Sequence, residues 1–570
     1  MKKILASVLL LLLSVAASAQ TFPVNNLVVN GTSQFTGQGN FTLPPTAPTP
    51  TTGDSSTKLA TTAFVAGAIG TAAPTVANNA ALQATSTASA ANVWRLGFTT
   101  SGDAPPLLYV ATAAPCTISA GAGDNGSQVR GANGNCWVAN FSPTGPLEGK
   151  QWGARCDNSH DDTSAMQAAF NTGRVIHYPA GVCLFQSGLV QLNGGIVGDG
   201  FTQTVLAAID TTSSNAITYS SNNPGYFANF KLVANNTKTG GSGLLVTASS
   251  GENSGTRIDS VNVVVFPVNI TMSPASNWVI ANSWLQEASQ QNLLIANANN
   301  PDSGDSTIVA STFSNSNAVP SIVWNSSGGI KVIGSKINGG TFGFFVGFNG
   351  TASTSDILIN GTSIENMTSS AIELSRSSGT STVSNIEIVG NQLAINANAV
   401  STDGSGAFYN VVVGDNVITM SSTTGSAIAL TAVNGFYVGG NSIFGNGGSP
   451  SGIAISTGST NGKIGKNTYI NIPTTLSNLS TTTFYERDKQ VVTTSITTGT
   501  AYGSSLFVGN ANVSFPVAFT VAPEVTCTVG TSAGVSAFPL TVTKTGFLAN
   551  AVSVTNGAVI SVTCWAEGVI

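Results

Sequence analysis

The stretch Val389-Gly390-Asn391-Gln392-Leu393 recurs along the chain as Val413-Gly414-Asp415-Asn416-Val417-Ile418 and as Gly439-Gly440-Asn441-Ser442-Ile443. Each copy reads as a short strand that meets a small or amide residue and then turns into a second strand. Aligning all copies gives one column of equivalent residues: Ser283, Ser311, Ser335, Thr362, Asn391, Asn416, Asn441 and Asn467. The first and last members lie 184 residues apart over seven intervals, or about 26 residues per unit.

A fixed period of this length is typical of a solenoid. The units contain strands and turns without helical periodicity, so a parallel β-helix is expected rather than a helical or leucine-rich repeat. A β-propeller is the main rival, but its blades need about 40 residues and four strands each. In a β-helix, apolar residues of each turn stack inside. The column residues are expected to stack at a corner, where asparagine side chains satisfy backbone groups of the turn.

The composition agrees with a solenoid whose outer surface consists mainly of hydroxyl and amide side chains. Of the 570 residues, 42% are hydrophobic and only 8% are charged, with 19 Lys and Arg against 24 Asp and Glu. Soluble domains usually carry about 25% charged residues. The balance excludes a coiled coil and an acidic disordered tail. It also excludes a basic nucleic-acid-binding protein, which needs clustered Lys and Arg to neutralise phosphates.

The N-terminus has the three parts of a secretory signal peptide. Met1-Lys2-Lys3 supplies the charged start, Ile4–Val15 the apolar segment, and Ala16-Ala17-Ser18-Ala19 the small-residue cleavage site. We expect residues 1–19 to be removed, and an N-terminal membrane anchor is the alternative. No other apolar run approaches the roughly 20 residues that a membrane-spanning helix needs, so no span is expected after cleavage.

Six cysteines fall into three local couples, Cys116/Cys136, Cys156/Cys183 and Cys527/Cys564. An even number in an exported chain predicts three local disulfides. Metal binding is the rival interpretation, but no C-x-x-C spacing occurs and neither His160 nor His177 completes a site. We therefore expect neither a metal ion nor a cofactor.

One block before the repeats carries further information on the fold. Residues 153–170 read as a loop, an N-cap and an amphipathic helix, in which Met166, Ala169 and Phe170 share one face. Val175–Gly181 and Gly194–Gly200 then read as strands bounded by Gly and Pro.

In this order the elements resemble the start of the pectate-lyase-like superfamily of right-handed parallel β-helices. Cys156 stands where that family commonly has glycine, and a Cys156–Cys183 bridge would tie the entry loop to the first turn. Asp161 and Asp162 have the residue type of a general acid and base. Capping the first turn of the helix is the interpretation that we favour for them.

Two other segments resemble bacteriophage tail fibres. The run Gly53-Asp54-Ser55-Ser56-Thr57-Lys58-Leu59-Ala60-Thr61-Thr62-Ala63-Phe64-Val65 follows Phe35-Thr36-Gly37, as in a short element of those fibres. After the charged cluster 486–489, the alternation around Cys527 and Cys564 resembles their small C-terminal β-sandwich. The expected organisation is a signal peptide (1–19), a low-complexity fibre-like segment (20–92), a small β capping unit (93–147), the parallel β-helix (148–484) and the β-sandwich (485–570).

Candidate catalytic residues are few, because no histidine occurs within the repeats and no catalytic motif of the β-helix enzymes is present. Glu373 lies 11 residues after Thr362, and Asp403 lies 12 after Asn391, so both are expected at nearly the same place on adjacent turns. Turns stack about 4.8 Å apart, and a retaining glycosidase needs its acid and nucleophile about 5–5.5 Å apart. Chance alignment of solvated carboxylates is the alternative.

Residues that would bind sugar are sought near these two carboxylates. Glu365 and Arg376 belong to the same turn as Glu373 and are the candidates for binding sugar hydroxyls. Trp284, Trp324 and the segment 342–348 could stack on sugar faces or pack in the core.

These features lead to an expected function. The resemblances imply a tail-spike or tail-fibre-like protein, trimeric and extracellular or in a virion tail, that binds bacterial surface polysaccharide. Depolymerase activity, by hydrolysis or by elimination, stays open. The signal peptide favours an alternative, a secreted bacterial enzyme similar to pectin lyases, and a non-catalytic adhesin is a third interpretation.

Overall fold

The computed structural model describes the chain from residue 73 to residue 568 with short gaps. The gaps are 298–304, 327, 349–353, 377–381, 404–406, 422–423, 447–449, 481–483, 486–487, 502–505, 516–517, 520–521 and 530–534. The expected signal peptide and the fibre-like run 53–65 lie outside the described residues. Among those residues, no helix combines the length and the apolar character needed to cross a membrane.

A small mixed α/β unit comes first. Its five-stranded sheet has the order β1-β2-β3-β5-β4, and helix α3 (Asn79–Gln83) packs on it. The strands are β1 (Thr75–Val76), β2 (Asn92–Arg95), β3 (Leu107–Ala111), β4 (Gln128–Arg130) and β5 (Cys136–Ala139), with a 3₁₀ turn η1 (Ser119–Gly121). The sheet thus begins before residue 93, because the short strand β1 pairs with β2. The predicted Cys116–Cys136 disulfide is present.

Arg95 joins this unit to the first turn of the solenoid. Its guanidinium is fully buried and donates to Asn79 Oδ1 (2.8 Å), to the Asn125 carbonyl (2.9 Å) and to the Gln151 carbonyl (2.7 Å). A buried cation needs such partners, because each unpaired donor would lose its hydration without compensation. Desolvation accordingly lowers the pKa of Arg95, and the nearby Asp103 and Asp124 oppose this shift.

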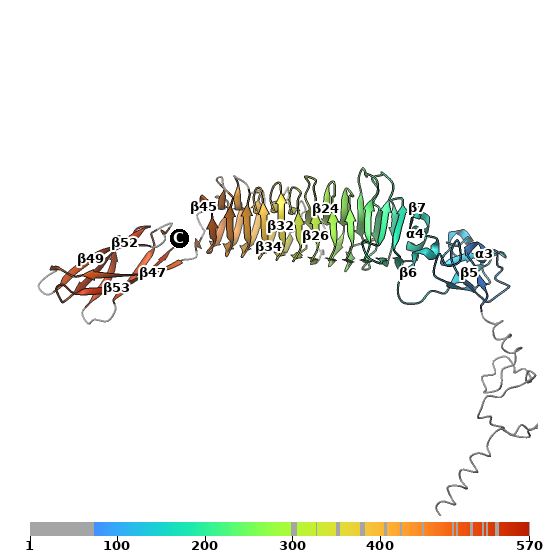
Figure 1. Ribbon diagram of the computed structural model, residues 1–570, viewed down its shortest axis with the longest axis horizontal. Helices are drawn as coiled ribbons and strands as arrows, with labels where there is room; N and C mark the ends of the chain where they lie inside the picture. The colour runs from blue at the N-terminus through green and yellow to red at the C-terminus, as the bar shows by residue number, and fades with distance from the viewer. Residues whose placement is uncertain are drawn as a thin grey trace, which may run out of the picture. The chain divides into compact units, whose positions relative to one another are not determined.

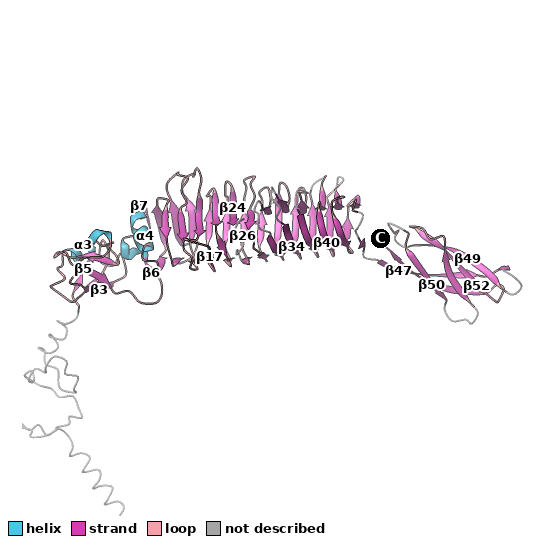
Figure 2. Cartoon of the chain, turned by 180° about the vertical axis from the view of Figure 1, so that it is seen from behind, coloured by secondary structure: helices cyan, strands magenta, loops and turns pink. Residues whose placement is uncertain are grey.

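The solenoid opens with the predicted helix, α4 (Thr163–Phe170), which follows the 3₁₀ turn η2 (Gly149–Trp152). Met166, Ala169 and Phe170 are fully buried, as their spacing predicts. Figure 2 shows α3 beside the N-terminal strands β3 and β5, and α4 at the end of the solenoid beside β6 and β7. The predicted Cys156–Cys183 disulfide ties the loop before α4 to the first turns.

The two aspartates before α4 have structural roles, but only one acts on the helix. Asp161 accepts the Thr163 amide at 3.0 Å. Asp162 is fully buried, and its carboxylate accepts the amides of Arg155 (2.8 Å) and Cys156 (3.0 Å), so it holds the entry loop instead of capping the helix.

Three parallel sheets form the solenoid. We number them I, II and III in the order in which each turn of the chain passes through them. The twelve strands of sheet III define twelve turns, which Figure 1 shows stacked side by side from β7 to β45. Sheet I contains β6 (Leu147–Glu148), β8 (Val175–Tyr178), β11 (Gly195–Gly198), β14 (Tyr226–Ala228), β18 (Arg257–Asp259), β22 (Val279–Ala281), β25 (Ser306–Val309), β28 (Ile330–Ile333), β31 (Thr354–Asn360), β34 (Thr382–Val389), β37 (Ala407–Gly414), β40 (Val433–Gly439), β43 (Thr460–Ile464) and β46 (Phe484–Tyr485).

The other two sheets follow the same progression along the chain. Sheet II contains β7 (Asp157–Asp161), β9 (Gly181–Phe185), β12 (Thr204–Ala208), β15 (Lys231–Ala234), β19 (Asn262–Val264), β23 (Trp284–Gln286), β26 (Thr312–Ser314), β29 (Lys336–Asn338), β32 (Ser363–Met367), β35 (Gln392–Ile395), β38 (Val417–Met420), β41 (Ser442–Gly445) and β44 (Thr468–Ile470). Sheet III contains β10 (Leu189–Gln191), β13 (Ile217–Ser220), β16 (Ser242–Thr247), β20 (Val268–Met272), β24 (Gln291–Asn297), β27 (Ile322–Ser326), β30 (Phe344–Phe348), β33 (Ile372–Arg376), β36 (Val400–Thr402), β39 (Ser426–Leu430), β42 (Ser451–Ile455) and β45 (Thr474–Asn478). A two-stranded sheet, β17 (Asn253–Ser254) with β21 (Ala275–Ser276), lies beside the turns.

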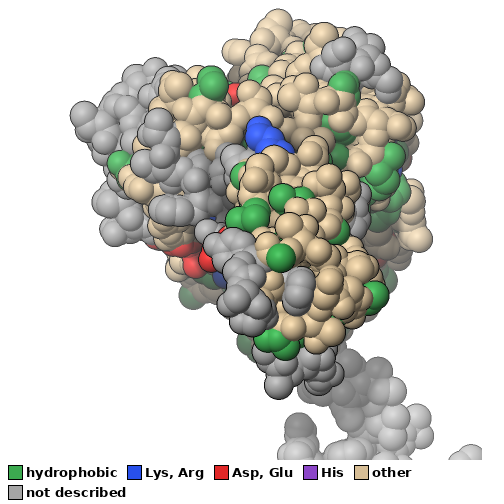
Figure 3. Space-filling model, turned by 90° about the vertical axis from the view of Figure 1, so that its left-hand side faces the viewer, with side chains coloured by type: hydrophobic (Ala, Val, Ile, Leu, Met, Phe, Trp, Pro, Cys, Tyr) green, Lys and Arg blue, Asp and Glu red, His purple; other side chains and the backbone are tan. Residues whose placement is uncertain are grey.

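The core of the solenoid consists of stacked aliphatic side chains, as the repeat predicts. In sheet I the register places Ile258, Ile280, Ile308 and Val332 in one column, and all four are fully buried. Alternate residues of every strand face the core, so equivalent positions on successive turns bury against each other. The outer positions are mostly uncharged and polar. Figure 3, which views the molecule from the end where the C-terminal strands lie, also shows few charged side chains.

The predicted corner column is confirmed as a continuous line of hydrogen bonds. The Ser283, Ser311 and Ser335 amides donate to the hydroxyl of the column residue on the next turn. From Thr362 onward asparagine takes over, and the Thr362 amide donates to Asn391 Oδ1 at 2.9 Å. Asn391, Asn416, Asn441 and Asn467 then bond side chain to side chain at 2.9–3.0 Å.

The C-terminal strands form the predicted β-sandwich. Two antiparallel sheets share one apolar core that includes Ile496, Phe547 and Val562. The predicted Cys527–Cys564 disulfide links two residues that are paired in register. The three-stranded sheet is β47 (Asp488–Thr497), β53 (Val559–Gly568) and β50 (Glu524–Val529), and the four-stranded sheet is β48 (Thr500–Ala501), β49 (Phe507–Ser514), β52 (Gly546–Ser553) and β51 (Ser536–Leu540).

Candidate functional site

The outer face of sheet III carries the two predicted catalytic carboxylates. In β33, Ile372 and Leu374 are fully buried, whereas Glu373 and Ser375 alternate with them and face outward, each partly exposed. Asp403 follows the last residue of β36 directly and is exposed. The strand period of two residues therefore puts Glu373, Ser375 and Asp403 on the same outer surface.

Hydrogen bonds join Glu373 to the next turn. The register places Glu373 between Phe345 of β30 and Ser401 of β36. The Ser401 hydroxyl donates to Glu373 Oε2, and Ser401 Oγ also lies 2.7 Å from Ser370 Oγ. One carboxylate oxygen is thus held from the side of the following turn.

Asp403 does not stack on Glu373. Its amide donates to the Leu374 carbonyl at 3.2 Å, and its Oδ2 accepts the Ser375 hydroxyl. Asp403 is therefore opposite Ser375, two residues further along the strand than Glu373, and the expectation that both carboxylates occupy nearly the same place is wrong. Strands about 4.8 Å apart and a rise of about 3.3 Å per residue put the two residues roughly 8 Å apart on the diagonal.

An aromatic pair adjoins Glu373. Phe345 faces outward from β30, and its ring stacks on that of Phe342 with centroids 5.1 Å apart. Trp324 points inward and is 1% exposed, so it packs in the core. We refer to Phe342, Phe345, Glu373, Ser375, Ser401 and Asp403 as the sheet III cluster.

The two predicted sugar-binding residues are not part of this cluster. Glu365 belongs to β32 of sheet II, on the other side of the corner 368–371, and its carboxylate accepts the Ser363 hydroxyl at 2.7 Å and lies 3.6 Å from Lys336 Nζ. Arg376 ends β33 opposite Phe348, and its side chain lies outside the described part of the structure.

Ser375, Ser401 and Ser370 were not among the predicted site residues. The register reveals Ser375, opposite Asp403, and Ser401, opposite Glu373, whereas Ser370 is found through its hydrogen bond with Ser401. Counting residues from the corner column, without the register, does not reveal them.

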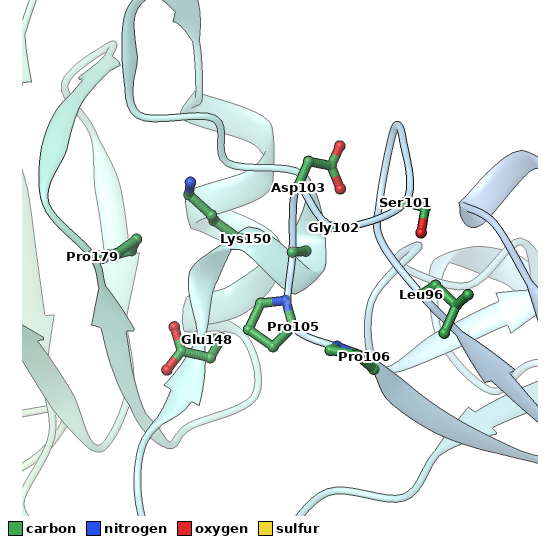
Figure 4. A pocket seen from close by; sticks show the side chains of 10 residues that line it. Leu96, Ser101, Gly102, Asp103, Pro105, Pro106, Glu148, Lys150 and Pro179 are labelled. Carbon is green, nitrogen blue, oxygen red and sulfur yellow. The ribbon is translucent and has the colours of Figure 1, made fainter.

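A cavity of about 520 Å³ lies between the N-terminal unit and the first turns, lined by Leu96, Asp103, Pro106, Glu148, Lys150 and Pro179 among others (Figure 4). Its acidic groups are already engaged. Asp103 accepts the amides of Phe98, Thr99 and Thr100 at 2.6–2.8 Å. Glu148 is hydrogen-bonded to His177. Both acidic side chains of the cavity therefore have structural partners.

His177, in β8, is held between two carboxylates, one from each neighbouring segment of sheet I: Glu148 of β6 and Asp199, which follows β11. Its Nδ1 lies 2.9 Å from both oxygens of Glu148, and its Nε2 lies 2.9 Å from Asp199 Oδ1. The hydrogen bond with Glu148, aided by Asp199 and opposed by burial, raises the pKa of His177 to about 9. Both ring nitrogens are occupied, so His177 acts as a clamp and not as a free base.

We expect this clamp to weaken in alkali. Because the folded-state pKa of about 9 exceeds the usual value of 6.5, the stabilisation is complete below about pH 6.5 and disappears as the pH rises through about 9. His177→Gln should lower the free energy of unfolding by about 1–2 kcal/mol at pH 6, less than the full shift implies because the side chains are partly exposed. Melting curves of both proteins between pH 6 and 10.5 test this; they should converge in alkali, and a constant difference would contradict it.

One group of metal-ligating residue types occurs among the described residues, namely Cys156, Asp162 and Cys183. The two sulfurs form a disulfide, and the Asp162 carboxylate accepts two amides. This group therefore does not offer the free thiolates that a zinc ion would need.

Comparison with known proteins places the fold. No family model and no curated protein matches the chain. Among solved structures, the A-module of a mannuronan C-5 epimerase from Azotobacter vinelandii superposes with a TM-score of 0.50 at 17% identity, over 60% of this chain and 99% of the module.

Two phage tailspikes match with lower scores. The first, from Acinetobacter baumannii phage Fri1, is described as a capsular polysaccharide depolymerase and gives a TM-score of 0.44 at 12% identity, over 87% of this chain and 98% of the tailspike. Tailspike protein 2 of an Escherichia coli O157:H7 phage gives 0.47 at 12% identity, over 88% and 76%. The sheet topology, together with the match to the epimerase module, shows that the chain has a parallel β-helix fold.

Proposed function

We propose that this chain is a tail-spike or tail-fibre-like protein that binds bacterial surface polysaccharide and hydrolyses it at the sheet III cluster. The observation that carries the proposal is the pair of carboxylates, Glu373 and Asp403, on one outer face beside the Phe342–Phe345 pair. Aromatic rings next to carboxylates suit a sugar chain, because the rings contact its apolar faces and the carboxylates accept its hydroxyls.

The separation of the two carboxylates favours an inverting mechanism. Inverting glycosidases hold their carboxyl groups about 6.5–9.5 Å apart, which leaves room for a water molecule. The backbones of the two residues are roughly 8 Å apart on the diagonal, and side chains that project from the same face keep a similar separation. We assign Glu373, beside Phe345, to protonate the glycosidic oxygen. Asp403, at the exposed end, takes a proton from the water that attacks the anomeric carbon, and the leaving sugar departs with the proton from Glu373.

The proposal includes the assembly and location that the sequence resemblance implies, a homotrimer in a virion tail or outside the cell. The three disulfides fit an oxidising compartment. A secreted bacterial enzyme would need the same disulfides. The presence or absence of the protein in purified phage particles separates the two origins.

Two substitutions test the chemistry. Glu373→Gln and Asp403→Asn should each lower the rate of polysaccharide cleavage at least about 100-fold, the usual contribution of a general acid or base. Glu387→Gln, an exposed carboxylate on the outer face of sheet I, is the matched control and should cleave at the wild-type rate. Reducing ends released from a panel of capsules and lipopolysaccharides measure the activity.

The products distinguish the mechanisms. Proton NMR of the first product should show inversion at the anomeric carbon. Retention would contradict the assigned roles, and unsaturated uronate ends would indicate a lyase instead. Wild-type rates in both variants would refute the site.

A non-catalytic adhesin is the second candidate. It is favoured by the serine hydroxyls that bind both carboxylates from the adjacent turn, because such contacts also occur in purely structural columns. Binding of a polysaccharide without release of reducing ends would support it.

A further inference from the structure

Trp284 stands on the outer face of sheet II, away from the sheet III cluster. Its side chain points out of β23 and the residue is 44% exposed. The indole packs against Phe201, whose ring centroid is 5.2 Å away at an interplanar angle of 46°. A tryptophan ring that packs on one side only can contact a ligand with its other apolar face and with its N–H.

Two lysines share the column of Trp284. The register aligns Lys231, Asn262, Trp284, Thr312 and Lys336 on five successive strands. At about 4.8 Å per strand, each lysine stands roughly 10 Å from the tryptophan along the solenoid. Lys231 forms no ion pair or hydrogen bond within the described chain, and Lys336 is half exposed with Glu365 at 3.6 Å.

Between Lys231 and Trp284 lies a polar atom that lacks a partner. Asn262 is 9% exposed, and its Oδ1 has no hydrogen-bond partner among the described residues. The oxygen is buried beneath the surface, so Asn262 separates Lys231 from the indole without itself contacting a ligand, and the contacts fall to the exposed side chains around it.

The neighbouring positions are also suited to hydroxyl groups. Gln286, Ser314 and Asn338 form the adjacent outer column of sheet II, in register with one another. Amide and hydroxyl side chains can both donate and accept hydrogen bonds. The surface therefore combines an aromatic face, neutral hydrogen-bonding groups and two cations. Glu365 is the next residue of the same outer column, opposite Asn338, and lies 3.6 Å from Lys336.

We propose that the outer face of sheet II around Trp284 is a second saccharide-binding surface, selective for a polysaccharide that carries negative charge. The indole contacts the apolar face of one sugar, and Lys231 and Lys336 pair with acidic groups of sugars on either side. In a chain with a net charge of −5, these two cations are what draws an anionic polymer to this face. The surface does not require the carboxylates of sheet III and binds without cleaving.

Binding of the full-length chain to a panel of acidic and neutral bacterial surface polysaccharides tests the inference. We expect at least one acidic polysaccharide to bind more tightly than every neutral one. Trp284→Ala should weaken that binding about tenfold or more, whereas Trp284→Phe keeps a ring and retains most of it. Lys231→Gln with Lys336→Gln should weaken it similarly and reduce its dependence on salt.

The matched control is Tyr226→Ala, which removes an aromatic side chain of similar exposure (41%) from sheet I and should bind as the wild type does. Absence of any preference for acidic polysaccharide, wild-type binding by Trp284→Ala, or an equal loss in Tyr226→Ala would overturn the inference. Cleavage is measured separately, so failure of the hydrolase proposal would be seen as inactive wild-type protein that still binds through Trp284.

Discussion

Replacing Asn416 by alanine is expected to destabilise the solenoid by about 4–6 kcal/mol, because buried polar groups that lose their partners cost about 1–3 kcal/mol each. Asn416 is 1% exposed. Its Oδ1 accepts from the Asn391 amide (2.9 Å) and from Asn391 Nδ2 (3.0 Å), and its Nδ2 donates to the Ile388 carbonyl and to Asn441 Oδ1 (both 2.9 Å).

Two further variants make this prediction specific. Asn416→Ser should recover part of the loss, since Ser311 and Ser335 accept the equivalent amide elsewhere in the same column. Asn434→Ala, which removes one hydrogen bond on the exposed outer face, should cost under about 1 kcal/mol.

Thermal melting and amide hydrogen exchange of β35, β38 and β41 measure these effects. Exchange is needed because a stack of repeats unfolds in parts, and the loss should be largest in the turns that contact residue 416. An Asn416→Ala protein as stable as Asn434→Ala would show that the column does not hold the corner together.

The second large effect is expected at Lys238. Its side chain is fully buried, and Nζ donates to Asp210 Oδ2 and to Ser187 Oγ, both at 2.8 Å. These residues come from the connections after β9, β12 and β15, so the contact ties three successive turns. Burial would raise the pKa of Asp210, but hydrogen bonds from Lys238, Ser187 and Thr212 outweigh it and hold the pKa well below its usual value.

Asp210→Asn should therefore destabilise these turns by about 3–5 kcal/mol, because it leaves a buried ammonium group without its counter-ion. The double variant Asp210→Asn, Lys238→Met removes both charges and should be more stable than the single variant. Arg257→Gln, which breaks an ion pair whose arginine side chain is 52% exposed, should cost under about 1 kcal/mol. Melting temperatures at pH 7 rank the three proteins, and a double variant less stable than the single one would contradict the explanation.

Residue counting succeeded for the corner column and failed for the catalytic pair, and the reason lies in β32. Glu373 is 11 residues after Thr362, but its neighbour Ser401 is only 10 after Asn391. The register of β32 shifts between Glu365 and Met367, where Asn366 has φ +60°. This bulge adds one residue to one turn and not to the next. The bulge contributes one residue of offset and the unequal counts of 11 and 12 contribute the other, so Asp403 is opposite Ser375 and not opposite Glu373.

Much of the architecture could be predicted without the structure. A period of about 26 residues and the alternation within each strand are local properties, and they determined the β-helix, its aliphatic stacks and the corner column. The three disulfides followed from the local spacing of the cysteines, and helix α4 from its apolar face.

The sites required the tertiary structure. Which outer residues become neighbours depends on bulges and corner lengths, so only the register separates Glu365 from Glu373 and places Phe345 beside the carboxylate. The direction of a side chain is decided in the same way: Trp324 is in the core and Trp284 is exposed, although both are tryptophans within strands. The sequence by itself determined the repeating core, because burial selects apolar residues at a regular spacing. The tertiary structure alone decided which residues meet on the outer surface. Many different polar residues allow folding at an outer position, so their order along the chain has no regular spacing that predicts their neighbours.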